Sequence, residues 1–217
     1  MDYFELLKTS CENVNLQFDE GKYNKFVEYK NLLQEWNEKI NLTAIVDDEG
    51  IFKKHFVDSI KVFNFEGLHK VDNVIDIGTG AGLPGIPMKI VKPDLNVVLL
   101  DSLQKRVNFL NEVIGKLGLE GIKAVHGRAE EAARIEYRDF FDVAVSRAVA
   151  NMTLLSELCL PFVKVNGYFV AMKGPSVDSE IGEAKNAINL LGGKLEEIIE
   201  VKIEESDLKH RRGREHY

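Results

Sequence analysis

Residues 74–85, VIDIGTGAGLPG, decide the expected fold of this chain. Three aliphatic residues and Asp76 lead directly into three glycines at alternate positions, Gly78, Gly80 and Gly82. A short apolar run bounded by glycines is typical of a buried parallel strand that ends in a tight turn. Glycine permits a positive φ and has no side chain to keep a ligand away from the backbone. The stretch therefore predicts a strand, a ligand-binding turn and a helix within an α/β protein.

Two classes of ligand use such a turn. Residues 80–85 fit G-x-G-x-x-G, the dinucleotide fingerprint, in which a helix begins at once and binds a pyrophosphate. Pro84 and Pro87 stand where that helix begins, which a first helical turn tolerates. The fuller pattern, D-x-G-x-G-x-G over residues 76–82, resembles the cofactor loop of Rossmann-like S-adenosylmethionine methyltransferases. The resemblance implies that Asp76 faces the cationic amino-acid end of the cofactor, directly or through water. We favour this second interpretation, and a glycine-rich connection without a ligand remains the alternative.

The composition is that of an ordinary globular protein. Of the 217 residues, 45% are hydrophobic and 29% are charged, which favours one domain with an appended segment. Neither a membrane-spanning apolar run nor a signal peptide is recognisable, so we expect a cytoplasmic protein that does not bind a membrane. The sequence does not determine the oligomeric state, and we favour a monomer. Cys11 and Cys159 are solitary, so we expect neither a disulfide framework nor a metal site.

Residues 1–70 show the apolar periodicity of helices. One stripe recurs at three- and four-residue steps through Tyr23, Phe26, Val27, Leu33, Trp36 and Ile40. A second stripe includes Ile51, Phe52, Phe56, Ile60 and Phe63. His55 and Asp58 lie near the second stripe, where a histidine among aromatic residues is more often a hydrogen-bonded packing residue than a catalyst. We therefore expect residues 1–70 to form a helical cap and substrate platform without a cofactor site, and residues 71–217 to form the Rossmann-like domain.

Beyond these helices, strands and helices alternate, and polar residues follow the strands. The strand over residues 96–100 ends in Asp101, which lies 19 residues beyond Gly82. This spacing is close to the roughly 20 residues at which an acidic side chain accepts hydrogen bonds from ribose hydroxyls. Ala129 and Glu130 follow the next strand, where a small residue leaves room for an adenine ring.

Positive residues lie at the remaining strand ends. Arg147 and Lys173 end two later strands, and Arg106 lies in the first turn of a helix, where a cation opposes the helix dipole. A doubly wound parallel sheet brings these strand ends to one crevice. The net charge of −7 argues against a broadly basic surface for nucleic acid. A local basic face at the crevice is the remaining hypothesis for binding an anionic partner.

Seven motifs, taken in order, carry a specific resemblance: EWNEKINLTAI, HFVDSI, DIGTGAGLPGIP, DSLQKRVNFL, GRAEE, SRAVA and FVAMKG. Together they resemble the bacterial ribosomal small-subunit RNA methyltransferase G family, also called glucose-inhibited division protein B. The resemblance implies a class I Rossmann-like fold and S-adenosylmethionine-dependent methylation of N7 of one guanine in 16S rRNA of the small ribosomal subunit. The family's cofactor contacts fall at Gly78, Leu83, Ala129, Glu130 and Arg147, beside the candidates Gly80, Gly82 and Asp101.

The positive residues at the crevice and the motifs that the chain lacks narrow the expected chemistry. Arg106, Arg147 and Lys173 are the expected RNA contacts. Methylation of an exocyclic amine usually uses a [DN]-P-P-[YF] tetrapeptide, where this chain reads SRAV at residues 146–149. Methylation of pyrimidine C5 needs a thiolate, and Cys159 is better interpreted as a core residue of a helix. The N7 lone pair is available in the neutral base, so proximity and orientation suffice and we assign no catalytic residue.

The C-terminus departs from the family pattern. Relatives usually continue into a further strand and a basic tail that contains proline, whereas this chain ends ESDLKHRRGREHY without apolar alternation after Ile203. We therefore expect the antiparallel strand that closes the sheet to be missing or remodelled. A missing strand and tail should weaken RNA binding more than cofactor binding.

Three other functions remain open. A small-molecule methyltransferase has the same cofactor crevice without a basic rim, and electrophoretic binding to rRNA separates the two. A nicotinamide-dependent oxidoreductase shares Asp101 and the glycines of residues 80–85, and NADH fluorescence tests it. A non-catalytic RNA-binding module is the third, if the altered C-terminus has abolished turnover.

Overall fold

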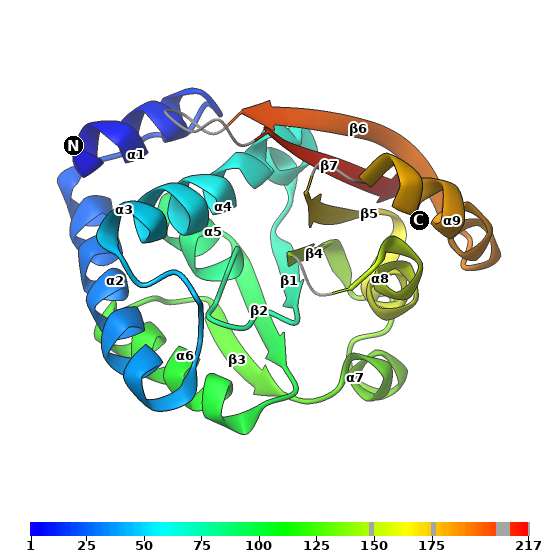
Figure 1. Ribbon diagram of the computed structural model, residues 1–217. Coiled ribbons are helices and arrows are strands. Elements are labelled where there is room, and N and C mark those ends of the chain that lie inside the picture. Colours follow the sequence, from blue (N-terminus) through cyan, green and yellow to red (C-terminus); the bar gives the residue numbers. More distant parts are fainter. Residues whose placement is uncertain (148–149, 175–176, 203–208, 217) are drawn as a thin grey trace.

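A central sheet carries helices on both of its faces (Figure 1). The computed structural model describes residues 1–147, 150–174, 177–202 and 209–216. Within these ranges the sheet has seven strands, in the spatial order β3 (Ile122–His126), β2 (Asn96–Asp101), β1 (Asn73–Ile77), β4 (Phe141–Arg147), β5 (Val163–Lys173), β7 (Lys209–His216) and β6 (Lys194–Lys202).

The order of the strands reverses beside β1. This strand pairs in parallel with β2 on one side and with β4 on the other, and the pairs β2–β3 and β4–β5 are also parallel. The carboxyl ends of β1 to β5 therefore lie at the same edge of the sheet. The gap between the ends of β1 and β4 is the topological switch point, where doubly wound sheets bind ligands. The predicted doubly wound, mostly parallel sheet is confirmed.

The C-terminal strands correct one expectation. Strand β7, KHRRGREH, is present and lies antiparallel between β5 and β6. The expected loss of this strand is therefore wrong. A strand inserted between two neighbours is held by backbone hydrogen bonds along both of its edges, which do not require alternating apolar side chains.

The helices divide between the two faces of the sheet. One face carries α1 (Tyr3–Glu12), α2 (Glu20–Ile40), α3 (Asp48–Gly50), the π-helical segment η1 (Ile51–Val57), α4 (Asp58–Ile60), the 3₁₀ segments η2 (Lys61–Asn64) and η3 (Glu66–Lys70), α5 (Gly85–Val91) and α6 (Gln104–Lys116). The other face carries α7 (Ala129–Ile135), α8 (Met152–Cys159), the 3₁₀ segment η4 (Leu160–Phe162) and α9 (Val177–Leu190). In the part of the chain that the structure describes, no helix is both long and apolar enough to cross a membrane.

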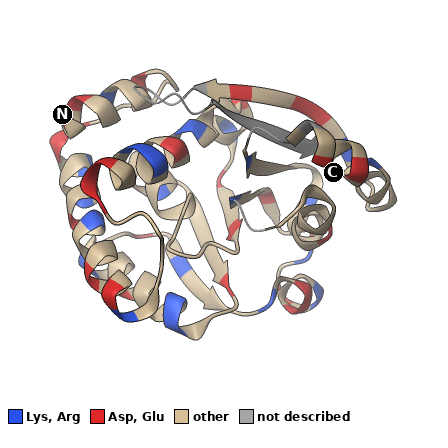
Figure 2. Ribbon diagram, in the orientation of Figure 1, with Lys and Arg blue, Asp and Glu red and all other residues tan. Residues whose placement is uncertain are grey.

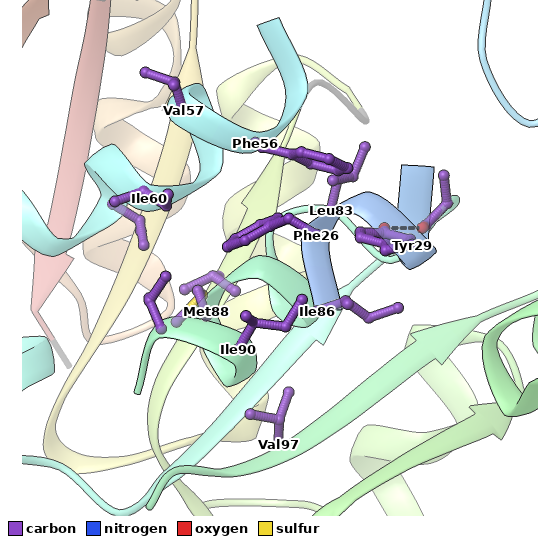
Figure 3. Packing of buried hydrophobic residues seen from close by; sticks show 14 of the residues in the cluster. Phe26, Tyr29, Phe56, Val57, Ile60, Leu83, Ile86, Met88, Ile90 and Val97 are labelled. Carbon is purple, nitrogen blue, oxygen red and sulfur yellow. Dashed lines mark hydrogen bonds between the residues drawn. The ribbon is translucent and has the colours of Figure 1, made fainter. Parts of the chain in front are cut away.

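The N-terminal helices share one hydrophobic cluster with the sheet and with the glycine-rich loop. Side chains of β1 alternate between the faces, so Val74 belongs to this cluster and Ile75 to the cluster on the opposite face. The rings of Phe26 and Phe56 lie 4.9 Å apart within it, and Figure 3 shows them with Leu83 of the loop. Burial of one such phenylalanine contributes about 1.5–3 kcal/mol, so this packing holds the loop against α2 and η1.

Asn41 directs the chain from α2 toward the carboxyl edge of the sheet. The helix begins where the Asp19 side chain accepts a hydrogen bond from the Lys22 N–H at 2.9 Å. It ends at Asn41, whose φ of +47° lies in the left-handed region that asparagine adopts more readily than most residues. The sharp turn brings residues 42–45 to the site described below.

The second apolar stripe of the N-terminal segment is helical but irregular. All five of its predicted positions, from Ile51 to Phe63, are buried. Residues 51–57 nevertheless form a π-helix instead of an α-helix. Short π-helical segments are rare and occur frequently at functional sites.

Candidate active site

A cavity of about 730 Å³ opens at the carboxyl ends of β1, β2, β4 and β5. Its volume falls within the roughly 300–1,000 Å³ typical of small-molecule sites. One wall consists of residues from loop 78–83 and from segment 101–106, and another of Arg147 with residues 172–174. The remaining wall comes from the N-terminal segment, between residues 42 and 58.

The glycines of the loop differ in what they do. Gly78, Gly80 and Gly82 all have positive φ, which L side chains rarely adopt. A Cβ on Gly80 meets no atom closer than the Gly78 carbonyl oxygen at 3.9 Å, and Gly80 lines the cavity. A Cβ on Gly82 lies 2.4 Å from Ile86 Cδ1 of α5. Gly80 therefore leaves open space at the cavity, whereas Gly82 does not line the cavity and permits the loop to pack on α5.

Asp76 supports the loop from behind. Its side chain is fully buried, and Oδ2 accepts hydrogen bonds from Thr79 Oγ1 at 2.6 Å and from the Gly85 N–H at 2.8 Å. Burial raises the pKa of this carboxyl to about 6. Asp76 does not line the cavity, and among the described residues its buried Oδ1 has no hydrogen-bond partner, so a contact with the cofactor, directly or through water, stays a prediction. Its Oδ2 atom fixes the start of α5 through the Gly85 N–H.

Tyr29 ties the N-terminal helices to the same loop. Its buried phenol, on α2, donates a hydrogen bond to the Ala81 carbonyl oxygen. Burial raises the pKa of the phenol, so it remains a donor at neutral pH. The loop is thus held by Asp76 from the sheet and by Tyr29 from a helix 52 residues earlier in the chain.

Asp101 and the glycine-rich loop meet as the sequence predicts. Asp101 lines the cavity although it is only 3% exposed. Its Oδ2 accepts the Gly80 N–H at 2.9 Å, and Arg106 Nη1 lies 3.5 Å from the same oxygen. Its Oδ1 accepts the Leu103 N–H at 2.9 Å. The carboxylate therefore links the ends of β1 and β2 and places a negative charge at the cavity wall.

Arg147 reaches the N-terminal segment across the cavity. Its Nη1 donates to the Lys54 carbonyl oxygen and to Asp58 Oδ2, each at 3.2 Å. Its Nη2 lies 3.4 Å from His55 Nδ1. The arginine lines the cavity as predicted, but its guanidinium is held by η1 and α4.

Sequence reasoning predicted a substrate platform in the N-terminal segment but did not identify which of its residues line the cavity. Residues from this segment that line the cavity are Leu42, Thr43, Ile45, Lys54, His55 and Asp58. His55 is buried and hydrogen-bonded, as predicted, with its Nε2 2.8 Å from Thr43 Oγ1. Burial, reinforced by the charge of Arg147, lowers the pKa of His55 to about 4. The available signal was the spacing of His55 and Asp58, three positions apart and hence on one helical face.

Of the four remaining predicted site residues, two line the cavity and two do not. Leu83 and Lys173 line it, but the Lys173 ammonium is paired with Glu180 Oε2 at 2.6 Å and donates to the Ala150 carbonyl oxygen at 2.7 Å. Ala129 and Glu130 begin α7 and do not line the cavity. They follow Gly127, whose N–H donates to the Asp101 carbonyl oxygen at 3.0 Å, so they lie beside the cavity at the end of β3.

The charges around the cavity are mixed. Among the residues that Figure 2 colours, Lys and Arg are interspersed with Asp and Glu over the helices. At the cavity itself the cationic side chains are those of Lys54, Arg106, Arg147 and Lys173. Lys54 is exposed and Arg106 is 34% exposed, so these two are the most accessible to an anionic partner.

Comparison with known proteins agrees with this geometry. The signature described as rRNA small subunit methyltransferase G matches residues 22–209. The ribosomal RNA small subunit methyltransferase G of Clostridium novyi (strain NT) is 59% identical over 96% of this chain and 86% of that protein. The protein of the same name from Clostridium botulinum (strain Loch Maree / Type A3) is 59% identical over 97% of this chain and 88% of its own length.

Solved structures show the same fold at low sequence identity. A SAM-dependent methyltransferase from Aquifex aeolicus matches with a TM-score of 0.56 and 20% identity, over 79% of this chain and 94% of that one. TYW2 of M. jannaschii, solved in complex with AdoMet, matches with a TM-score of 0.54 and 16% identity, over 73% and 74% of the two chains. Because the family signature spans most of the sequence and relatives share more than half of its residues, the chain belongs to the rRNA small subunit methyltransferase G family.

Proposed function

We propose that this chain transfers a methyl group from S-adenosylmethionine to N7 of a guanine in 16S rRNA of the small ribosomal subunit. The observation that carries the proposal is the junction of Asp101 with Gly80 at the switch point of the sheet, in a member of this family. We further propose that it acts as a cytoplasmic monomer, without a metal ion.

The residues at the cavity fit this cofactor. Gly80 leaves open space where a side chain would otherwise stand, and Asp101 presents a carboxylate that suits the two adjacent hydroxyls of a ribose. Gly78 and Leu83 complete this side of the proposed site, and Ala129 and Glu130 would border the adenine. When bound, S-adenosylmethionine supplies an electrophilic methyl group on a positively charged sulfur.

The residues of the chain then act by position instead of by proton transfer. The N7 atom of neutral guanine carries no proton, so its attack requires no general base. His55 is buried, and its lowered pKa leaves it neutral and a weak base near pH 7. The walls of the cavity align the base and exclude water, which are the contributions that such a transfer needs.

RNA binding is assigned to the cationic side chains at the cavity. We propose that Arg106 and Lys173 meet phosphates, while Arg147, which borders both β4 and η1, stands nearest the target base. Residues 1–70 serve in this proposal as a helical extension that completes the substrate wall of the domain formed by residues 71–217. The contacts of Arg147 with Asp58 and with the Lys54 carbonyl support this role.

The test is methylation of the natural substrate. Purified protein is incubated with radiolabelled S-adenosylmethionine and small ribosomal subunits from a bacterial strain that lacks the enzyme, and the label is mapped. We expect one labelled guanine in 16S rRNA, released as 7-methylguanine. Subunits from a strain that retains the enzyme are the control, because their target is already methylated. Absence of label from both, or label on a different base, contradicts the proposal.

A further inference from the structure

Thr43, His55 and Arg147 form a hydrogen-bonded chain along the N-terminal wall of the cavity. Arg147 Nη2 lies 3.4 Å from His55 Nδ1, and His55 Nε2 lies 2.8 Å from Thr43 Oγ1. The three residues come from β4, η1 and the turn after α2, and all three line the cavity.

The chemistry of arginine fixes the direction of this chain. A guanidinium has only N–H donors, so His55 Nδ1 accepts its hydrogen bond. A neutral imidazole that accepts at Nδ1 carries its proton on Nε2, and that N–H is then donated to Thr43 Oγ1. The lowered pKa of His55 agrees with a neutral ring beside Arg147.

The Thr43 hydroxyl oxygen is thereby saturated as an acceptor. Besides His55, the Ile45 N–H donates to Thr43 Oγ1 at 3.1 Å. A hydroxyl has two acceptor lone pairs and one proton to donate. The Thr43 backbone is itself fixed, because its N–H donates to Asn37 Oδ1 at 2.8 Å. The side chain therefore presents the cavity with a positioned hydroxyl whose remaining capacity is to donate.

We propose that the Thr43 hydroxyl donates a hydrogen bond to O6 of the target guanine and is a determinant of base specificity. This inference rests on the proposed function, in which N7 of guanine faces the cofactor. O6 lies beside N7 on the same edge of the base, so it reaches the cavity wall together with N7. Adenine carries an amino donor at the position of O6, so the two purines differ at the atom that Thr43 meets. Two donors facing each other in a partly buried wall leave both unpaired, and a site built to donate rejects such an analogue.

The experiment compares bases that differ at position 6. Small subunits are reconstituted with 16S rRNA that carries guanine, inosine or 2,6-diaminopurine at the target position. Inosine keeps O6 and loses the 2-amino group, whereas 2,6-diaminopurine keeps N7 and the 2-amino group but has an amino donor in place of O6. We expect the wild-type protein to prefer guanine and inosine over 2,6-diaminopurine in kcat/KM.

Thr43→Val removes the hydroxyl at almost constant shape. It should lower kcat/KM for guanine and inosine by about three- to tenfold, leave the value for 2,6-diaminopurine unchanged, and so reduce the preference by that factor. Thr43→Ser should retain the preference, as should the control Thr9→Val on α1, where the side chain is exposed and remote from the cavity. The preference is a ratio within one preparation, so it does not depend on the fraction of protein that folds.

Two results would overturn the inference. One is an unchanged preference in Thr43→Val. The other is a loss of affinity for S-adenosylhomocysteine in Thr43→Val, measured by calorimetry, that is as large as the loss of kcat/KM for guanine. Such a loss would assign the hydroxyl to the cofactor. If the wild-type protein methylates no guanine-containing subunits, the proposed function fails instead, so the two failures are distinguishable.

Discussion

Asp101 combines a structural and a proposed binding role at the end of β2. Each of its carboxylate oxygens accepts one backbone N–H, from Gly80 and from Leu103. A carboxylate has about four lone-pair sites, so capacity remains for the hydroxyls of a ribose. The position of Asp101 was predictable from the sequence, because the spacing between the glycine-rich turn and the end of the next strand is a local property of the fold.

Asp101→Ala should weaken binding of S-adenosylhomocysteine. Loss of a hydrogen bond to a charged group costs about 1.5–3 kcal/mol, which corresponds to a loss of affinity of roughly ten- to a hundredfold. Calorimetry measures this change. Asp94→Ala, which removes an exposed acid paired with Lys92, is the matched control and should bind normally. Unchanged affinity in Asp101→Ala would remove the ribose assignment.

Gly80→Ala and Gly82→Ala should separate ligand binding from folding. Both positions have positive φ, and the left-handed conformation costs an alanine about 1–2 kcal/mol. At Gly80 the new methyl group faces the cavity, so S-adenosylhomocysteine affinity should fall more than stability. At Gly82 it meets Ile86 and adds an overpacking cost of about 1–3 kcal/mol, so urea unfolding should show the larger loss of stability there. Equal effects of the two variants on both measurements would contradict this division.

At the scale of elements, periodicity predicted the strands and the apolar helix faces, because each follows from residues close together in sequence. The position of η1 at the cavity was not predictable in this way. It depends on the contacts that Arg147 makes with Asp58, 89 residues earlier in the sequence, and with His55, 92 residues earlier. Strand β7 was missed for a related reason, since its pairing with β5 and β6 is a property of the backbone and leaves no apolar pattern.

Tyr29→Phe tests how α2 supports the glycine-rich loop. The change removes the donor to the Ala81 carbonyl and leaves that buried acceptor unpaired, which should lower the free energy of unfolding by about 1–3 kcal/mol. Urea denaturation measures it. Tyr23→Phe on the same helix serves as the control, because Tyr23 packs chiefly through its ring on Phe4 and Phe52. Equal stability of the two variants would show that the hydrogen bond does not hold the loop.

At the scale of the whole molecule, a net charge of −7 must coexist with RNA binding. We expect the RNA to bind to the cationic side chains of the cavity wall, where the local charge is positive although the net charge of the chain is negative. Both predicted phosphate contacts are paired, Lys173 with Glu180 at 2.6 Å and Arg106 with Asp101 at 3.5 Å. Arg106 is the more available of the two, because its side chain is 34% exposed and that of Lys173 only 9%.

Arg106→Ala should therefore weaken binding to small subunits and reduce the slope of log affinity against log salt by about one. Filter binding at several salt concentrations measures both quantities. Lys8→Ala on α1, which removes a half-exposed cation remote from the cavity, should change neither. A salt slope that stays at the wild-type value in Arg106→Ala would exclude a phosphate contact for this residue.

The most direct test of methyl transfer without a general base is a single-turnover rapid-quench measurement at saturating cofactor and small subunits. The rate is followed between pH 7 and pH 9, and the modified base is identified by mass spectrometry. His55, with its pKa lowered to about 4, is neutral over this whole range, and N7 has no proton to lose. The expected result is 7-methylguanine formed at a rate that does not change with pH. A rate that rises tenfold per pH unit, or methyl label on an exocyclic amine, would contradict both the acceptor atom and the mechanism.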